Sequence, residues 1–260
     1  MIIFFDKVAQ GIGRVTREAI EQFGSISIFF WRVLLAFPAT LKRFHLIVEQ
    51  MLLLGVCSVP IVFLVSLFVG AISAWQVQYL FADAIPLTYL GAAVGKAVFT
   101  ELGPVLTAIV VTGRVGAKIA AELGTMRVTE QIDALTCLSM DPYSYLLAPR
   151  MIAGITMLPI LTIFSTFFAI VSAQLLSQYA LGLSGAAFYH GMKLLFKVQD
   201  VVVCLTKAFV FGGVISLSGC YYGFLTRGGA VGVGNSTKKA VVAAMVLILV
   251  SNLLVVSILL

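Results

Sequence analysis

One carboxylate lies within an apolar stretch that is long enough to cross a membrane. Glu101 stands near the middle of residues 86–113, in the sequence Glu-Leu-Gly-Pro. A carboxylate at that depth costs roughly 2.5–3.5 kcal/mol on membrane-insertion scales, and such residues usually face a cavity or a polar partner. Pro104 cannot donate a backbone hydrogen bond to Thr100, and Gly103 adds flexibility, so the helix should kink here. We therefore predict an intramembrane polar site that contains Glu101, Thr100 and Pro104.

Two lysines in apolar stretches are candidate partners for Glu101. Lys96 is five residues away on the same stretch, so the two side chains do not share a helix face cleanly. Lys207 belongs to another stretch and lies nearer the outer surface, so a bridge to Glu101 needs a long reach. The alternative is a protonated Glu101 that is hydrogen-bonded within a helix bundle.

A second group of charged residues occupies positions 117–140, between two apolar stretches. Apolar residues recur there at helical spacing, and the pattern shifts near Gly124, which predicts a bend or a break between two short helices. Asp141 and Pro142 are typical of an N-cap followed by the first residue of the next helix. We predict an amphipathic cytoplasmic helix over these residues.

The acids of this segment favour a protein partner. An anionic membrane surface attracts lysine and arginine and gains nothing from acids. The alternative, a helix that lies on the inner membrane surface and binds nothing, therefore explains them less well than docking to a basic groove. The candidate docking residues are Glu122, Met126, Arg127, Glu130, Asp133 and Asp141.

The composition indicates an all-α integral membrane protein. Of the 260 residues, 61% are hydrophobic and 11% charged, and the mean hydropathy is +1.09, whereas soluble domains carry about 25% charged residues. Uninterrupted apolar runs favour helices over a barrel. Five runs reach the roughly 20 residues that cross a ~30 Å hydrocarbon core: Met51–Ala74, Pro86–Gly113, Met151–Leu176, Val201–Thr226 and Ala240–Leu260.

The N-terminal region, residues 1–50, is predicted to hold an interfacial helix. Its apolar stretch, 26–37, is interrupted by Arg32 and is too short to cross a membrane; a helix buried against the spans is the alternative. The connections between spans are too short to form domains. Residues 1–260 should therefore form one domain, with the five-span bundle over 51–260.

Basic residues predict the orientation of the chain. Of its 17 lysines and arginines, only Lys193 and Lys197 fall outside if the N-terminus is cytoplasmic, while Lys96 and Lys207 lie within spans. The positive-inside rule therefore places the N-terminus in the cytoplasm and the C-terminus outside. This bias explains the net charge of +6, and no aromatic–basic interleaving favours nucleic acid as a partner.

The sequence offers no catalytic machinery of its own. It lacks the G-x-x-x-x-G-K-[ST] phosphate loop, so we expect no ATP site in this chain. His45 and His190 are predicted on opposite sides of the membrane, which excludes a Ser/His/Asp site. The four cysteines form no Cys-x-x-Cys pair, and we expect neither disulfides nor a metal site. Gly91-x-x-x-Gly95 and the small residues of 212–223 predict close helix packing, in a bundle or at a homodimer seam.

The chain resembles the MlaE-type permeases of ABC transporters, a lipid-trafficking family that also serves Mce systems. The resemblance covers nearly the whole chain. It rests on an ordered set of motifs: Glu101-Leu-Gly-Pro104, Gly113-Arg-Val-Gly116, Ala121-Glu-Leu-Gly124, Met126-Arg127-x-Thr129-Glu130-Gln131, Asp141-Pro142 and Pro149-Arg150.

The resemblance implies an N-terminal interfacial helix plus five spans, in a bacterial inner-membrane protein that works as a homodimer. It implies a pocket for phospholipid tails at the dimer interface, with Glu101 and Lys207 near it. Residues 117–140 would be the coupling helix that meets a separate ATPase subunit, which binds ATP and magnesium. A Mce-domain lipid-binding protein would sit on the periplasmic side.

Two departures from some relatives predict a reduced charge network. Thr100 stands where some relatives have arginine, and Asn252 where some have an acid in the last span. The leading hypothesis is the membrane subunit of an ATP-driven lipid transporter. The alternatives are a secondary transporter that carries protons on Glu101, and a membrane anchor that only assembles other subunits.

Overall fold

The computed structural model describes residues 21, 24–81 and 85–259. Every regular element in the described residues is a helix, which confirms the predicted all-α fold. Six helical stretches are long and apolar enough to cross a membrane. They are Gly24–Leu41, Phe44–Phe81, Leu87–Val128, Tyr143–Ala180, Val198–Phe224 and Gly229–Leu259.

Most of these stretches join several elements end to end. The stretch 87–128 contains three α-helices separated by two π-helical turns, η3 and η4. The bounds are α2 Phe44–Leu54, η1 Val56–Ser58, α3 Val59–Phe81, η2 Leu87–Tyr89, α4 Leu90–Ala97, η3 Val98–Leu102, α5 Gly103–Val111, η4 Thr112–Gly116, α6 Ala117–Val128, α7 Gln131–Cys137, η5 Tyr143–Leu147, α8 Ala148–Ala180, α9 Gly185–Leu195, α10 Val198–Phe224 and α11 Gly229–Leu259.

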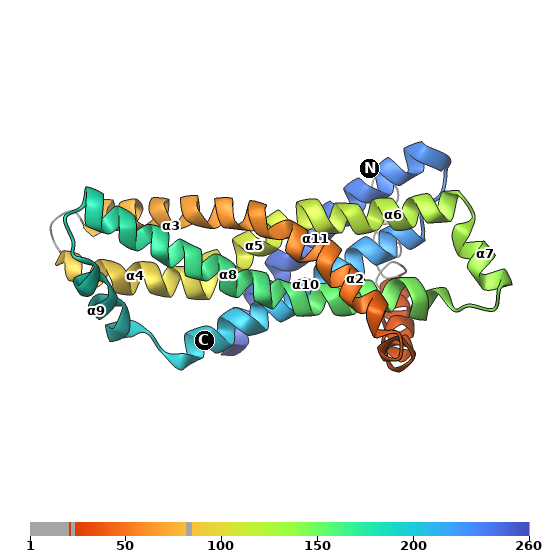
Figure 1. Ribbon diagram of the computed structural model, residues 1–260, viewed down its shortest axis with the longest axis horizontal. Helices are drawn as coiled ribbons and strands as arrows, with labels where there is room; N and C mark the ends of the chain where they lie inside the picture. Colours follow the sequence, from red (N-terminus) through yellow and green to blue (C-terminus); the bar gives the residue numbers. More distant parts are fainter. Residues whose placement is uncertain (1–20, 22–23, 82–84, 260) are drawn as a thin grey trace, which may run out of the picture.

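The bundle is elongated: α3, α4, α6 and α8 run along its long axis, and α11 crosses it obliquely (Figure 1). Helix α8 packs between α3 and α10, and α10 also packs against α11 and α6. Two short helices mark the ends of the bundle in Figure 1, with α7 at one end and α9 at the other. These are called the α7 end and the α9 end below.

The helix Gly24–Leu41 differs from the other stretches. It is the shortest of the six, at 18 residues, and the least apolar. In Figure 1 it is the red helix beside α2, and it runs across the long axis of the bundle instead of along it. The helix is longer than the predicted apolar stretch 26–37 and is long enough to cross a membrane, so the prediction from length was wrong. Its direction still agrees with the predicted interfacial helix. It is also packed on the bundle, because Val33 is buried and Thr40 Oγ1 donates a hydrogen bond to Ser144 O at 2.9 Å.

The break predicted near Gly124 is wrong. Helix α6 continues through Gly124 to Val128, and the chain turns at Glu130, whose φ is 59°. Gly124 serves packing, because a Cβ there would lie 3.0 Å from Thr226 Oγ1. The predicted helix over 117–140 is therefore two elements: α6 extends the second span inside the bundle, and only α7 projects from it.

Several predicted boundaries also move outward. The second span does not end at Gly113, because a π turn at Thr112–Gly116 carries the helix onward. The last helix begins at Gly229, not at Ala240, and the first long stretch runs from Phe44 to Phe81. Apolar runs locate the part of a helix that lies in lipid, whereas the backbone hydrogen bonds continue into polar sequence.

The connection 177–200 contains a helix that the sequence analysis missed. Ser184 caps α9 by accepting a hydrogen bond from Ala187 N, and α9 packs against α4. A Cβ at Gly91 would overlap the carbonyl oxygen of Phe188, and one at Gly95 would lie 2.7 Å from Met192 Cγ. The Gly91-x-x-x-Gly95 motif therefore serves packing within one chain.

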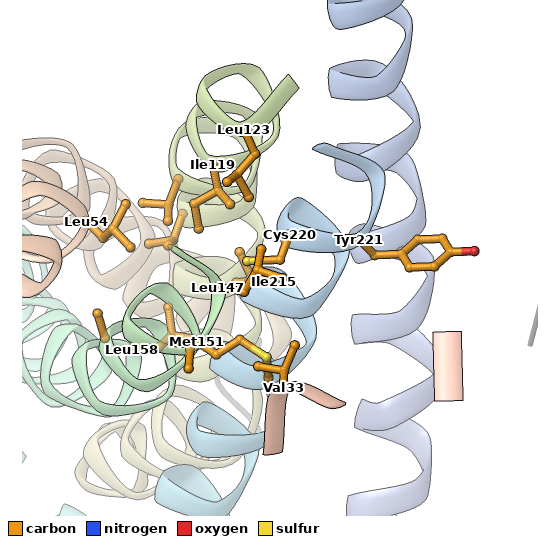
Figure 2. Packing of buried hydrophobic residues seen from close by; sticks show 14 of the residues in the cluster. Val33, Leu54, Ile119, Leu123, Leu147, Met151, Leu158, Ile215, Cys220 and Tyr221 are labelled. Carbon is orange, nitrogen blue, oxygen red and sulfur yellow. The ribbon is translucent and has the colours of Figure 1, made fainter. Parts of the chain in front are cut away.

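Two apolar clusters hold the bundle together. The larger gathers side chains from the N-terminal helix, α6, α8 and α10, among them Val33, Leu123, Met151 and Ile215 (Figure 2). The smaller lies toward the α9 end around Phe188. The clusters fix how α10 and α8 pack, and the polar groups described next depend on that packing.

Candidate intramembrane polar site and docking end

The π turn at Val98–Leu102 positions the polar site. Pro104 has no N–H, so the carbonyl of Thr100 lacks its usual helical donor. Lys207 Nζ, from α10, donates to Thr100 O at 2.7 Å. The predicted irregular backbone is therefore present, and its free carbonyl is bound by a side chain from another helix. Thr100 Oγ1 turns back to Lys96 O at 2.8 Å.

Glu101 joins three helical segments. Its Oε1 accepts a hydrogen bond from Lys207 Nζ at 2.5 Å, and its Oε2 accepts one from Asn252 Nδ2, on α11, at 3.0 Å. The bridge to Lys207, which was expected to need a long reach, is formed. It forms because the stem of Lys207 runs inside the bundle, where the side chain is 0% exposed.

The site is closed on one side and open on the other. Lys207 is buried, whereas the Glu101 side chain is 43% exposed at the surface of this single chain. Buried charges are stable only when good geometry and further hydrogen bonds accompany the pairing, and Lys207 has both. The result is a fixed carboxylate that faces outward from a spanning segment and can meet water, a polar ligand or another subunit.

Asn252, which stands where some relatives have an acid, still contacts Glu101. Its amide donates to Glu101 where an acid would need a proton to do so. Asn252 Oδ1 is buried and has no hydrogen-bond partner among the described residues. The departure therefore removes a charge but preserves a contact to Glu101.

Lys96 is not part of the Glu101 pair. Its Nζ lies 3.8 Å from Asp200 Oδ1. Asp200 is buried, and its Oδ2 accepts a hydrogen bond from Lys197 N at the start of α10. The sequence analysis missed Asp200, although an acid in the first turn of a helix is a usual signal for capping.

Glu122, predicted to dock a partner, is tied within the bundle. Its Oε2 accepts a hydrogen bond from Arg150 Nη2 at 3.2 Å, and its Oε1 lies 3.8 Å from Lys118 Nζ. Arg150 is buried, and its Nη1 also donates to Leu146 O. These contacts join α6 to α8. The sequence offered Arg150 only as part of a motif, without a partner.

The other predicted docking residues gather around α7. Arg127 Nη1 pairs with Asp133 Oδ1 at 2.5 Å, and the Arg127 guanidinium lies 6.0 Å from the centre of the Phe224 ring. Glu130 and Asp133 are exposed. Met126 instead packs partly against the larger apolar cluster.

Asp141 has the predicted capping role. Its carboxylate accepts hydrogen bonds from the backbone N–H groups of Tyr143 and Ser144, both at 3.1 Å. It therefore orders the start of the helical stretch that continues into α8. Leu138, near the end of α7, is 71% exposed. The α7 end thus presents acids beside an apolar side chain.

Comparison with known proteins gives one consistent result. Residues 47–258 match the family described as Permease MlaE. A probable ABC transporter permease protein of Rickettsia conorii is 38% identical over 95% of this chain and 96% of its own length. A protein of the same description from Synechocystis is 40% identical over 88% and 90%, and one from Pyropia yezoensis is 32% identical over 90% and 89%.

Proposed function

The chain belongs to the MlaE permease family, a family of multi-pass membrane proteins of ABC transporters, and we propose that it moves phospholipid or a similar amphiphile. In this proposal it works in a bacterial inner membrane and passes lipid between that membrane and a periplasmic Mce-domain carrier. A separate ATPase subunit binds ATP and magnesium. The α7 end and the N-terminus face the cytoplasm, and the C-terminus faces the periplasm.

The observation that carries the proposal is the open side of the polar site. Glu101 is 43% exposed in this single chain, yet it belongs to a stretch with the composition of a membrane span. Lipid tails cannot solvate a carboxylate, and such residues face a bundle interior or a wet cavity. A second copy of the chain would cover Glu101 and create a pocket that is polar on one wall and apolar elsewhere.

Such a pocket suits an amphiphile. Helix α11 carries Asn252, and only 11% of its most apolar 18-residue segment is buried in this single chain. Its apolar side chains could therefore line a space for lipid tails beside Glu101. A tail-filled pocket with one charged wall would hold a lipid by its two chemically different parts.

The α7 end suits the ATPase subunit. Asp133 is exposed on α7, a short helix that projects from the bundle, and Glu130 is exposed at the turn just before it. Acids on a projecting helix match a basic groove better than an anionic membrane surface. Helix α6 belongs to the same continuous helical stretch as Glu101. A displacement of α7, which follows α6 after a turn, could therefore be transmitted along that stretch to the polar site.

The test is a double substitution on α7. We expect E130K/D133K, in the transporter reconstituted with its ATPase subunit, to lose lipid movement while ATP hydrolysis continues, because like charges would face the groove. The measurements are transfer of a fluorescent phospholipid between vesicles and phosphate release in the same sample.

The matched control is R127Q. It removes the same Arg127–Asp133 ion pair but keeps both acids. Because this proposal assigns the docking to the acids and not to Arg127, R127Q should retain coupling. Undiminished lipid movement in E130K/D133K contradicts docking through these acids. Equal loss in R127Q would attribute the effect to the broken ion pair instead.

A proton-coupled carrier is the second candidate, because Glu101 is a half-exposed carboxylate within a span. Both oxygens of Glu101 already accept hydrogen bonds, so a proton carrier would have to break these contacts in each transport cycle. Lipid movement by the chain alone in liposomes under a pH gradient, without any ATPase subunit, would support this second candidate. An anchor without transport activity would leave lipid transfer unchanged in E101Q.

A further inference from the structure

The distance between Lys96 and Arg114 along the second span is close to the thickness of the hydrocarbon core. Lys96 is 18 residues from Arg114 on the continuous helical stretch Leu87–Val128. At 1.5 Å per residue this separation is about 27 Å, close to the ~30 Å thickness of the hydrocarbon core. In the proposed orientation the α7 end faces the cytoplasm, and placing Arg114 at the inner boundary would put Lys96 at the outer boundary, at the level of the outer-leaflet phosphates.

The ammonium group of Lys96 is held loosely. Its distance to Asp200 Oδ1, 3.8 Å, is too long for a hydrogen bond. Asp200 is fixed, since it is buried and its second oxygen accepts from Lys197 N. The Lys96 side chain is 42% exposed, and in the described residues it donates no hydrogen bond. Its three donors are available to a ligand.

The neighbouring charged residues on η3 and α10 are not free to bind a phosphate. Lys207 lies seven residues beyond Asp200 on α10, about 10 Å deeper. It is fully buried, and its contacts to Thr100 O and Glu101 occupy it. Both oxygens of Glu101 accept hydrogen bonds from Lys207 and Asn252, so Glu101 offers no donor to a phosphate. Among the charges of α4, η3 and the outer half of α10, Lys96 is the cation with free donors.

We propose that Lys96 binds a phosphate oxygen of the transported amphiphile's headgroup, and that Asp200 retains the ammonium group when no lipid is present. This inference rests on the proposed lipid transport and adds a specificity-determining residue to it. Glu101, five residues deeper, keeps the phosphate from sinking toward the middle of the membrane. The headgroup therefore stays at Lys96 while the tails extend past Glu101.

The test compares two lipids with the same tails. The complete transporter is placed in nanodiscs that contain equal amounts of phosphatidylglycerol and a phosphate-free galactosyl diacylglycerol, then extracted in mild detergent. Mass spectrometry measures the ratio of the two lipids that remain bound. We expect K96Q to lower the phosphatidylglycerol ratio about tenfold, since a charge-assisted hydrogen bond is lost, while K96R stays within about twofold of the unmodified protein.

K193Q is the matched control, because Lys193 is an exposed lysine of α9 on the same side; its ratio should not change. An unaltered ratio in K96Q overturns the phosphate contact. Equal loss of both lipids in K96Q assigns Lys96 a structural role and also overturns it. If the unmodified transporter retains neither lipid, the proposed lipid transport fails, and the role of Lys96 fails with it.

Discussion

Two ion pairs in this chain have the same length and opposite surroundings. Lys207–Glu101 and Arg127–Asp133 both measure 2.5 Å between nitrogen and oxygen. Lys207 is 0% exposed and its partner Glu101 is 43% exposed, whereas Arg127 and Asp133 are 36% and 57% exposed. Equal geometry therefore does not mean equal energy. A charge inside the bundle cannot return to water when its partner is removed, whereas a charge at the α7 end can.

The largest effect is expected from the Lys207–Glu101 pair. E101L should destabilise the chain by about 3–5 kcal/mol, because it leaves the fully buried Lys207 ammonium group without its carboxylate. The measurement is the free energy of unfolding in mixed micelles. The double variant K207M/E101L removes the buried ammonium group as well and should recover more than half of the loss. A single variant as stable as the unmodified chain would contradict the account of the buried pair.

The sequence predicted the parts of this site that depend on local chemistry. Pro104 cannot donate, so a free carbonyl at Thr100 follows from residue types alone. Which side chain would bind that carbonyl does not follow, because Lys207 is 107 residues away and its direction depends on how α10 packs. The contact of Asn252 was missed for the same reason: the departure from an acid was visible, but its distance to Glu101 was not.

At the α7 end, the sequence located the features of the region correctly but misplaced a local one. The sequence placed acids, a cap at Asp141 and a helix break in the right region, yet it put the break at Gly124. Glycine is a frequent breaker, but here the small residue lets α6 approach Thr226. The turn occurs at Glu130, a non-glycine residue with positive φ, which no simple pattern marks. Helix α9 was missed because apolar runs locate spans and not short helices outside them.

An intermediate loss of stability is expected from substitution of Arg150, because the exposure of its side chain lies between those of the cations in the other two pairs. Its side chain is 5% exposed, but its partner Glu122 is 34% exposed. R150M should therefore cost about 2 kcal/mol, from the loss of hydrogen bonds to a carboxylate and to Leu146 O, because Glu122 can partly return to water and keeps Lys118 nearby. The same unfolding assay measures it. A loss as large as that of E101L would mean that Glu122 cannot return to water once Arg150 is removed.

The smallest effect on stability is expected at Asp133. D133N removes the exposed pair with Arg127 and should change the free energy of unfolding by less than about 1 kcal/mol, because water solvates both groups once they separate. Arg127 also keeps its position over the Phe224 ring. High salt should weaken the Arg127–Asp133 pair in the unmodified chain more than the Lys207–Glu101 pair, since a pair with one fully buried partner is screened much less. If D133N destabilised the bundle as much as R150M, the contact between α6 and α7 would be a structural tie, and α7 would not be free to dock.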